Sequence, residues 1–389
     1  MEPIYLDHNA TTPVAPEVRE AMLPCLGELF GNPSSGYRAG REARAAVDRA
    51  RGQVAALVGA RAEEIVFTSG GTEANNLALV GYVHARGPAG AHIVASAVEH
   101  PSVLQPLHAL AGEGVEVTLV APRPHGALDA EELIAALRPQ TVLISLMHAN
   151  NELGTLQPVA EVAAEAARRG IAVHTDAAQS AGKVALDVGD LGVDLLSLAG
   201  HKLYAPKGVG ALWIRPGTPL SPLLHGGGQE RGLRPGTEPV PAIVGLGAAC
   251  ALVTQELAES TPRLRALRDH FEAELIARVD DVQVNGADAP RLPNTSHVSF
   301  LGRDGALLLS AVPEVMASTG SACHTDATDP SHVLTAIGAS LSAIRGAVRF
   351  SLGHGTTDWK VERALELIVK AAALSRSAAP ESVDARRRD

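Results

Sequence analysis

Seven short apolar runs rich in β-branched residues constrain this chain more than any other feature. They are continuous stretches of apolar residues rather than alternating ones, and helical patterns such as residues 158–170 separate several of them. Continuous apolar runs are typical of strands buried on both faces of a mostly parallel sheet. The sequence therefore predicts an α/β fold with a doubly wound large domain. The runs span residues 64–69, 92–97, 115–120, 141–147, 171–177, 193–199 and 209–214.

The pattern changes after Pro241, where a long helical stretch begins. We expect this stretch to run from 242 to 278, with a break near Thr261–Pro262, and to be followed by strands at 294–300 and 348–352 and a last helix. These elements indicate a smaller α+β domain. The expected division is a large domain at 14–255, a small domain at 1–13 and 256–375, and a disordered tail at 376–389.

Composition and charge exclude several classes of partner. The 389 residues carry a net charge of −10, and the one basic cluster is at Arg386–Arg388, which argues against nucleic acid or an anionic membrane as a partner. No apolar run of membrane-spanning length and no signal peptide is expected. Three distant cysteines fit neither a disulfide framework nor a metal site, so no metal and a cytoplasmic location are predicted.

Two segments at predicted strand ends carry candidate ligand-binding residues, because open α/β sheets bind ligands beyond the carboxyl ends of their strands. Gly70, Gly71 and Thr72 form a turn before a helix, which suits a phosphate group, although an ordinary strand–helix turn explains them equally well. Asp176 directly follows a buried strand and needs a partner. A protonated pyridine nitrogen is one partner. A role as the N-cap of the next helix is the alternative.

Lys202 is the best candidate among five lysines for an amine that attacks a carbonyl group. It follows a predicted strand and His201 and precedes a glycine-containing turn, whereas Lys360 and Lys370 lie on the polar side of the last helix. Lys183 is expected in a loop. A surface lysine at a strand end is the ordinary alternative, and a nucleophilic role requires restrained geometry and a lowered pKa.

Cys323 differs from the other two cysteines in its sequence surroundings. Cys25 and Cys250 have apolar neighbours and are expected to be buried. Small and turn-forming residues surround Cys323, which predicts an exposed loop with an accessible thiol. Such a thiol is a candidate nucleophile, and the adjacent His324 either favours its ionisation or has no role.

The order of these segments along the chain resembles the cysteine desulfurase family of class-V aminotransferase-like enzymes. The matching segments run from residues 5–13 through 67–76, 148–154, 174–180, 200–202, 226–238 and 320–323 to 348–353. The resemblance implies the fold type I architecture of enzymes that depend on pyridoxal 5′-phosphate (PLP), with a mostly parallel seven-stranded sheet. It implies a homodimer that converts L-cysteine to L-alanine and passes the sulfur, as a persulfide, to an acceptor or scaffold protein.

The same resemblance assigns roles to individual residues. Lys202 matches the lysine that binds PLP covalently, His100 the residue that stacks on the ring and assists proton transfer, and Cys323 the thiolate that receives the sulfur. Asn32 and Arg349 match groups that hold the substrate carboxylate. The remaining matches are cofactor contacts, with Thr237 supplied by the other subunit: Gly71, Thr72, Asn151, Asp176, Gln179, His201 and Thr237.

Two departures from the family pattern leave a second enzyme open. Ala199 replaces a serine that binds phosphate in many members, and Cys323 is followed by His324 rather than threonine; both features resemble selenocysteine lyases. Conversion of L-selenocysteine to L-alanine and selenide is therefore the main alternative. An aminotransferase of the same fold and a silent sulfur-carrier protein are the others, since fold alone does not fix function.

Overall fold

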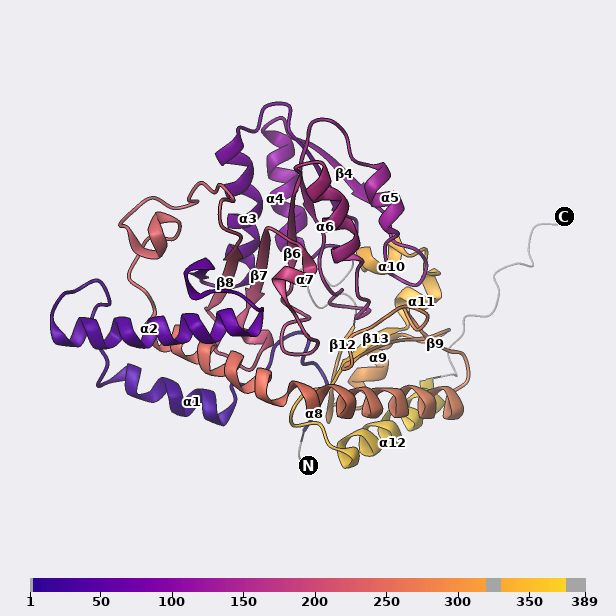
Figure 1. Ribbon diagram of the computed structural model, residues 1–389. Helices are drawn as coiled ribbons and strands as arrows, with labels where there is room; N and C mark the ends of the chain where they lie inside the picture. The colour runs from indigo at the N-terminus through magenta and orange to yellow at the C-terminus, as the bar shows by residue number, and fades with distance from the viewer. Residues whose placement is uncertain (1–2, 320–329, 376–389) are drawn as a thin grey trace.

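A seven-stranded sheet forms the centre of the computed structural model, which describes residues 3–319 and 330–375 (Figure 1). Each of the seven predicted runs contains one of its strands. The strand order is β2-β8-β7-β6-β5-β3-β4, and β8 is antiparallel to both of its neighbours while the other pairs are parallel. The strands are β2 (Ile65–Thr68), β3 (His92–Ser96), β4 (Glu116–Val120), β5 (Thr141–Ser145), β6 (Ala172–Asp176), β7 (Leu195–Ala199) and β8 (Gly210–Ile214).

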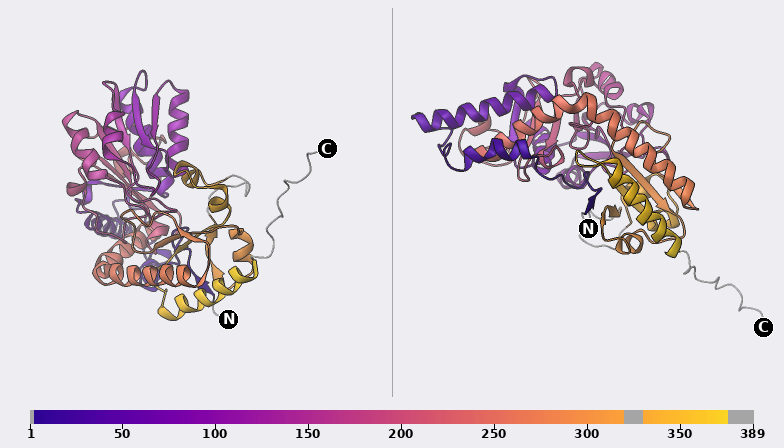
Figure 2. Two further views of the ribbon diagram at one scale, coloured as in Figure 1. Left: turned by 90° about the vertical axis from the view of Figure 1, so that its right-hand side faces the viewer. Right: turned by 90° about the horizontal axis from the view of Figure 1, so that it is seen from below.

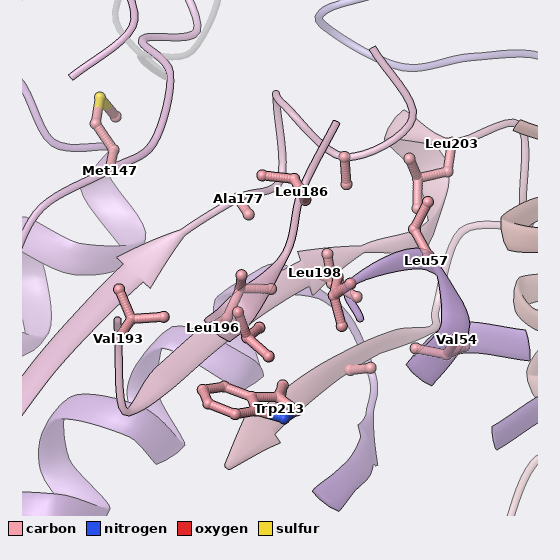
Figure 3. Close-up of a cluster of buried hydrophobic side chains, with 14 of the residues drawn as sticks. Val54, Leu57, Met147, Ala177, Leu186, Val193, Leu196, Leu198, Leu203 and Trp213 are labelled. Carbon is pink, nitrogen blue, oxygen red and sulfur yellow. The ribbon is translucent and has the colours of Figure 1, made fainter. Parts of the chain in front are cut away.

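Helices bury both faces of this sheet except at the edge strand β4, which explains why the sequences of the buried strands are continuously apolar. One face packs on α3 (Gly71–Arg86) and α4 (Pro101–Gly112). The other packs on further helices, and Figure 3 shows part of this core, with Leu196, Leu198 and Trp213 of the sheet near Leu57 and Val54 of α2. The helices on this second face are α2 (Arg38–Leu57), α5 (Ala130–Ala135), α6 (Val159–Arg168), α7 (Val188–Leu191) and the first half of α8 (Val240–Arg278).

A second, four-stranded antiparallel sheet lies beside the first, in the order β12-β13-β10-β9. Its apolar core contains Ile4 and Leu6 from the N-terminus together with Phe271, Phe300 and Phe350. The chain start thus packs with the C-terminal third, although the residue boundaries of the two domains stay a prediction. The elements are β1 (Ile4–Tyr5), β9 (Val282–Val284), β10 (Thr295–Phe300), α9 (Gly305–Ser310), β11 (Val315–Met316), β12 (Ser318–Thr319), α10 (His332–Ala336), α11 (Leu341–Arg345), β13 (Ala347–Ser351) and α12 (Asp358–Leu374).

The long helix α8 joins the two parts, and the predicted break at Thr261–Pro262 is wrong. The helix continues through Pro262 although proline lacks a backbone N–H. Packing on both sides of the proline outweighs the lost hydrogen bond: the first half contacts α1 (Pro16–Met22) and α2, and the second half lies beside α12 (Figure 2). The expected domain boundary at 255/256 therefore falls inside a continuous helix.

The expectation that no apolar run reaches membrane-spanning length is also wrong for α8. Among the described residues, this helix alone is long and apolar enough to cross a bilayer by length and composition. The core helix of a soluble protein passes the same test, and 44% of its most apolar window is buried within the protein. Its apolar residues Ile243, Leu246 and Val253 belong to the core of the large sheet.

Candidate active site

A cavity of about 370 Å³ lies beyond the carboxyl ends of the central strands, where open α/β sheets bind ligands. It gathers side chains that follow β2, β3, β6 and β7, together with a residue of β13. Nine of the residues predicted for the site line it: Gly71, Thr72, His100, Asn151, Asp176, Gln179, His201, Lys202 and Arg349.

Lys202 reaches the cavity from the short 3-10 helix Gly200–Lys202, directly after β7. Gly200 permits this turn, because a Cβ atom there would lie 2.9 Å from the carbonyl oxygen of Val209. The Lys202 Nζ donates hydrogen bonds to the carbonyl oxygens of Asn9 (2.6 Å) and Ala10 (2.7 Å). The amine is thereby held at a defined position by the N-terminal segment, which meets the geometric requirement for a nucleophilic lysine.

Asp176 ends β6 and is buried at one side of the cavity. Its Oδ2 accepts a hydrogen bond from Asn75 Nδ2 at 2.8 Å, and its Oδ1 accepts one from the backbone N–H of Ala178 at 2.9 Å. The sequence left two roles open for Asp176, a cap for the next segment and a partner for a ligand. The carboxylate caps the local turn and also lines the cavity, so its position is compatible with both roles. Two neutral donors fix its position and leave its negative charge available to a cationic ligand group.

His100 is a neutral, oriented imidazole that follows the carboxyl end of β3 and caps the N-terminus of α4. Burial lowers the pKa of His100 below its usual range, so the ring is uncharged at pH 7. Its Nδ1 accepts a hydrogen bond from the backbone N–H of Ser102 at 3.1 Å and lies 2.8 Å from the Ser102 hydroxyl. Because Nδ1 accepts from the backbone, the ring proton belongs on Nε2.

The N-terminus of α3 supplies the predicted anion site. Gly71 and Thr72 line the cavity in the first turn of this helix, where backbone N–H groups and the helix dipole favour negative charge. A Cβ atom at Gly71 would lie 3.1 Å from the methyl group of Ala199, so these two small residues pack closely. Ala199 donates no side-chain hydrogen bond here. His201 completes this wall, and burial lowers the pKa of His201 to about 4.

Arg349 lies on β13 and brings a guanidinium group to the cavity from the smaller sheet. Its Nη1 donates to the carbonyl oxygen of Asn151 at 3.0 Å, and its Nη2 donates to Asp7 Oδ1 at 2.8 Å. The second oxygen of Asp7 accepts from the Ser318 hydroxyl at 2.8 Å. A buried guanidinium held on two sides is well placed to receive a carboxylate.

Two predicted site residues lie away from the cavity, and a third falls outside the described residues. Asn32 is exposed, and its side-chain oxygen accepts a hydrogen bond from the backbone N–H of Ser34, so the structure does not bring it to the cavity. Thr237 is exposed too, in agreement with a residue that would serve a second subunit. Cys323 lies outside the described residues. Cys25 and Cys250 are buried as predicted, and burial raises the pKa of Cys250 to about 12.

The sequence reasoning missed three residues at or beside this cavity. Asn9 and Asn75 line it, and Lys183 lies in a turn, as predicted, but its side chain is buried and donates to Gln179. Asn75 had a usable signal, because it lies four residues after Gly71 on the same helix face. Asn9 had none, since its position depends on a contact between distant segments.

Comparison with known proteins assigns the family. A model of the family "Aminotransferase class-V" matches residues 4–364. Cysteine desulfurase IscS of Dictyoglomus turgidum is 47% identical over 367 residues, which cover 94% of this chain and 93% of that protein. The chain belongs to the cysteine desulfurase family of class-V aminotransferases. This membership confirms the resemblance, the fold class and the enzyme class that the sequence predicted.

Solved structures share this fold. A structure described as a NifS-like protein has a TM-score of 0.89 and 35% identity, and the match covers 96% of this chain and all of that one. A structure described as SspA in complex with cysteine has a TM-score of 0.79 and 40% identity, with coverage of 90% and 98%. Both matches extend over most of this chain and show the same fold.

Proposed function

We propose that the protein is a PLP-dependent cysteine desulfurase that converts L-cysteine to L-alanine and transfers the sulfur through Cys323 to an acceptor protein. One observation carries the proposal: a restrained lysine amine, a buried carboxylate, a neutral imidazole and a helix N-terminus surround one cavity, with an arginine on its far side. Membership in the cysteine desulfurase family supports the same reaction.

The lining residues fit PLP. Gly71 and Thr72 would hold its phosphate at the N-terminus of α3, Asp176 would pair with its ring nitrogen, and Lys202 would bind its aldehyde carbon. The side-chain oxygen of Asn151 is buried and has no hydrogen-bond partner among the described residues, so it is available to a bound polar group. When bound, PLP supplies an electron sink that stabilises negative charge on the substrate carbon.

Protons are handled by two groups on this chain. Lys202 Nζ would take a proton from the substrate carbon and return it, because its hydrogen bonds to the Asn9 and Ala10 carbonyls keep it at the cavity wall. His100 presents Nε2–H toward the cavity as a donor, since its Nδ1 is engaged by Ser102. Burial lowers the pKa of His100, so the ring stays uncharged near neutral pH and acts toward the cavity as a hydrogen-bond donor.

Sulfur transfer requires a nucleophile in addition to these groups. The Cys323 thiolate attacks the sulfur of the substrate, so that one S–S bond forms while the Cβ–S bond of cysteine breaks. The organic product is alanine, which takes up a proton at Cβ, and the enzyme product is a persulfide on Cys323. Transfer of that outer sulfur to an acceptor thiol restores Cys323.

The function is tested by alanine release from L-cysteine and from L-selenocysteine, measured side by side with the PLP-loaded enzyme. We expect turnover of L-cysteine, and we expect Arg349→Lys to raise KM by about tenfold or more, because lysine cannot form the paired hydrogen bonds of a guanidinium. Arg386→Lys in the C-terminal tail is the matched control. Alanine release from selenocysteine alone would reject the desulfurase in favour of the lyase.

We further propose that the enzyme is a two-fold homodimer. Leu26 and Phe30 are 69% and 78% exposed, which leaves apolar surface for a second subunit. The segment 226–238 that carries Thr237 is anchored by Glu230, whose buried carboxylate accepts hydrogen bonds from Arg51 and from the backbone N–H of Phe67. Analytical ultracentrifugation is expected to show a dimer, and an active monomer at assay concentration would contradict this.

A further inference from the structure

Lys183 is a buried lysine that the proposed reaction does not use. It lies in the turns after β6 and is 8% exposed. Its Nζ donates hydrogen bonds to Gln179 Oε1 at 2.9 Å and to Asn9 Oδ1 at 3.1 Å. Burial, with Lys202 and Arg349 nearby, lowers the pKa of Lys183 well below its usual range. Burying an amine beside two other cationic groups is costly, so its contacts need an explanation.

The contact with Gln179 fixes which end of that amide faces the cavity. The Lys183 Nζ donates to the amide oxygen of Gln179, and an amide oxygen can only accept, so this contact holds the oxygen on the lysine side. The amide nitrogen must then point the other way, where it donates to the carbonyl oxygen of Asn9 at 3.0 Å. Gln179 lines the cavity, and an amide nitrogen carries two hydrogens. Gln179 therefore offers its second N–H, and not an acceptor, to a bound ligand.

The contact with Asn9 connects Lys183 to Lys202. The Asn9 side-chain oxygen accepts from Lys183 and from Asn294 Nδ2 at 3.2 Å, while its side-chain nitrogen donates to Thr295 Oγ1 at 2.9 Å. The main-chain oxygen of the same residue accepts a hydrogen bond from Lys202 Nζ at 2.6 Å. Lys183 thus supports the residue whose carbonyl group holds the candidate nucleophile, through bonds that lie wholly inside the protein.

We infer that Lys183 is a positioning residue of the site: it orients the Gln179 amide with its nitrogen toward the cavity and, through Asn9, fixes the carbonyl group that holds Lys202. The inference rests on the proposed function, because the ligand that would accept a hydrogen bond from the Gln179 amide is PLP. A hydrogen-bond donor at Gln179 suits an anionic oxygen on the cofactor ring, and an inverted amide would place an acceptor against it.

The test is Lys183→Met, which keeps the chain length and removes the donors, with Lys370→Met on the exposed side of α12 as the matched control. Three quantities are measured: the absorption spectrum of bound PLP, its dissociation constant, and the thermal midpoint of the apoprotein. We expect a shifted absorption maximum and about tenfold weaker PLP binding in Lys183→Met, with neither change in the control. An unchanged spectrum and affinity would overturn the inference.

A double-mutant cycle separates positioning from a general loss of stability. In a Gln179→Leu background no amide is left to orient, so Lys183→Met is expected to change the spectrum and the affinity for PLP much less than in the wild type. Equal effects in both backgrounds would overturn the inference. If Lys183→Met does not fold, the Gln179→Leu variant is measured alone. The inference then requires that this variant shift the absorption maximum of bound PLP. Failure of the wild type to bind PLP would instead reject the proposed function.

Discussion

Replacing Lys202 with alanine is expected to lower cysteine turnover on the order of 10³-fold or more and to abolish the covalent link between PLP and the protein. In the proposed reaction, Lys202 would supply both the amine that binds the cofactor and the base that acts on the substrate carbon. Its hydrogen bonds to the Asn9 and Ala10 carbonyls show an amine held in one position at the cavity wall. Reduction with borohydride followed by peptide mapping measures the link directly.

A second lysine, the buried Lys183, is the alternative position at which this experiment could detect a PLP adduct. Lys183 is buried nearby, and burial lowers its pKa well below the usual range, which is a property of reactive lysines. It does not line the large cavity, however, and its amine is engaged by Gln179 and Asn9. We therefore expect the reduced adduct on Lys202 in the wild type and on no lysine in Lys202→Ala. An adduct on Lys183 in the wild type would contradict the assignment.

Replacing Cys323 with serine is expected to abolish alanine formation from L-cysteine while leaving PLP bound. A serine hydroxyl is not ionised at neutral pH and does not attack sulfur, whereas the residues that hold the cofactor are unchanged. Absorption spectroscopy should show bound PLP and a spectral change on addition of cysteine. Steady-state alanine release should fall to background. Cys250→Ala, at a buried position remote from any proposed chemistry, is the control and should retain activity.

Selenocysteine makes the same variant more informative. Selenium leaves carbon more readily than sulfur, so Cys323→Ser is expected to retain some selenocysteine turnover even when cysteine turnover is lost. Loss on cysteine alone means that the thiol serves C–S cleavage. Full cysteine activity in Cys323→Ser would instead place the acceptor of sulfur elsewhere.

The strands were predictable because their signal is local. A strand with both faces buried must be continuously apolar, and β2 to β8 each fall inside a run that the sequence shows. The ends of those strands led directly to Gly71, Asp176 and Lys202, since the topology of an open sheet places them at one edge, whereas His100 was named only through the family resemblance. Helix α8 was harder, because the proline signal at Pro262 is local and the packing that overrides it is not.

Other site features depend on contacts between segments far apart in the sequence. Asn9 forms hydrogen bonds with Lys202, Lys183 and Thr295, and the sequence around residue 9 does not predict these contacts. Elimination among the lysines selected Lys202 but placed Lys183 in an ordinary loop, because exposure cannot be read from a turn sequence alone. Asn32 is exposed in this chain and does not line the cavity, so its role in holding the substrate carboxylate stays a prediction.

The central claim is that sulfur passes from cysteine to Cys323, and the most direct measurement is the location of the persulfide. The PLP-loaded enzyme is mixed with one equivalent of L-cysteine without an acceptor, and its thiols are alkylated. Peptide mass spectrometry then locates the added sulfur atom on Cys25, Cys250 or Cys323. We expect it on the Cys323 peptide, in an amount equal to the alanine released. Alanine formation with the added sulfur on Cys25 or Cys250, or on none of the three cysteines, would contradict the account.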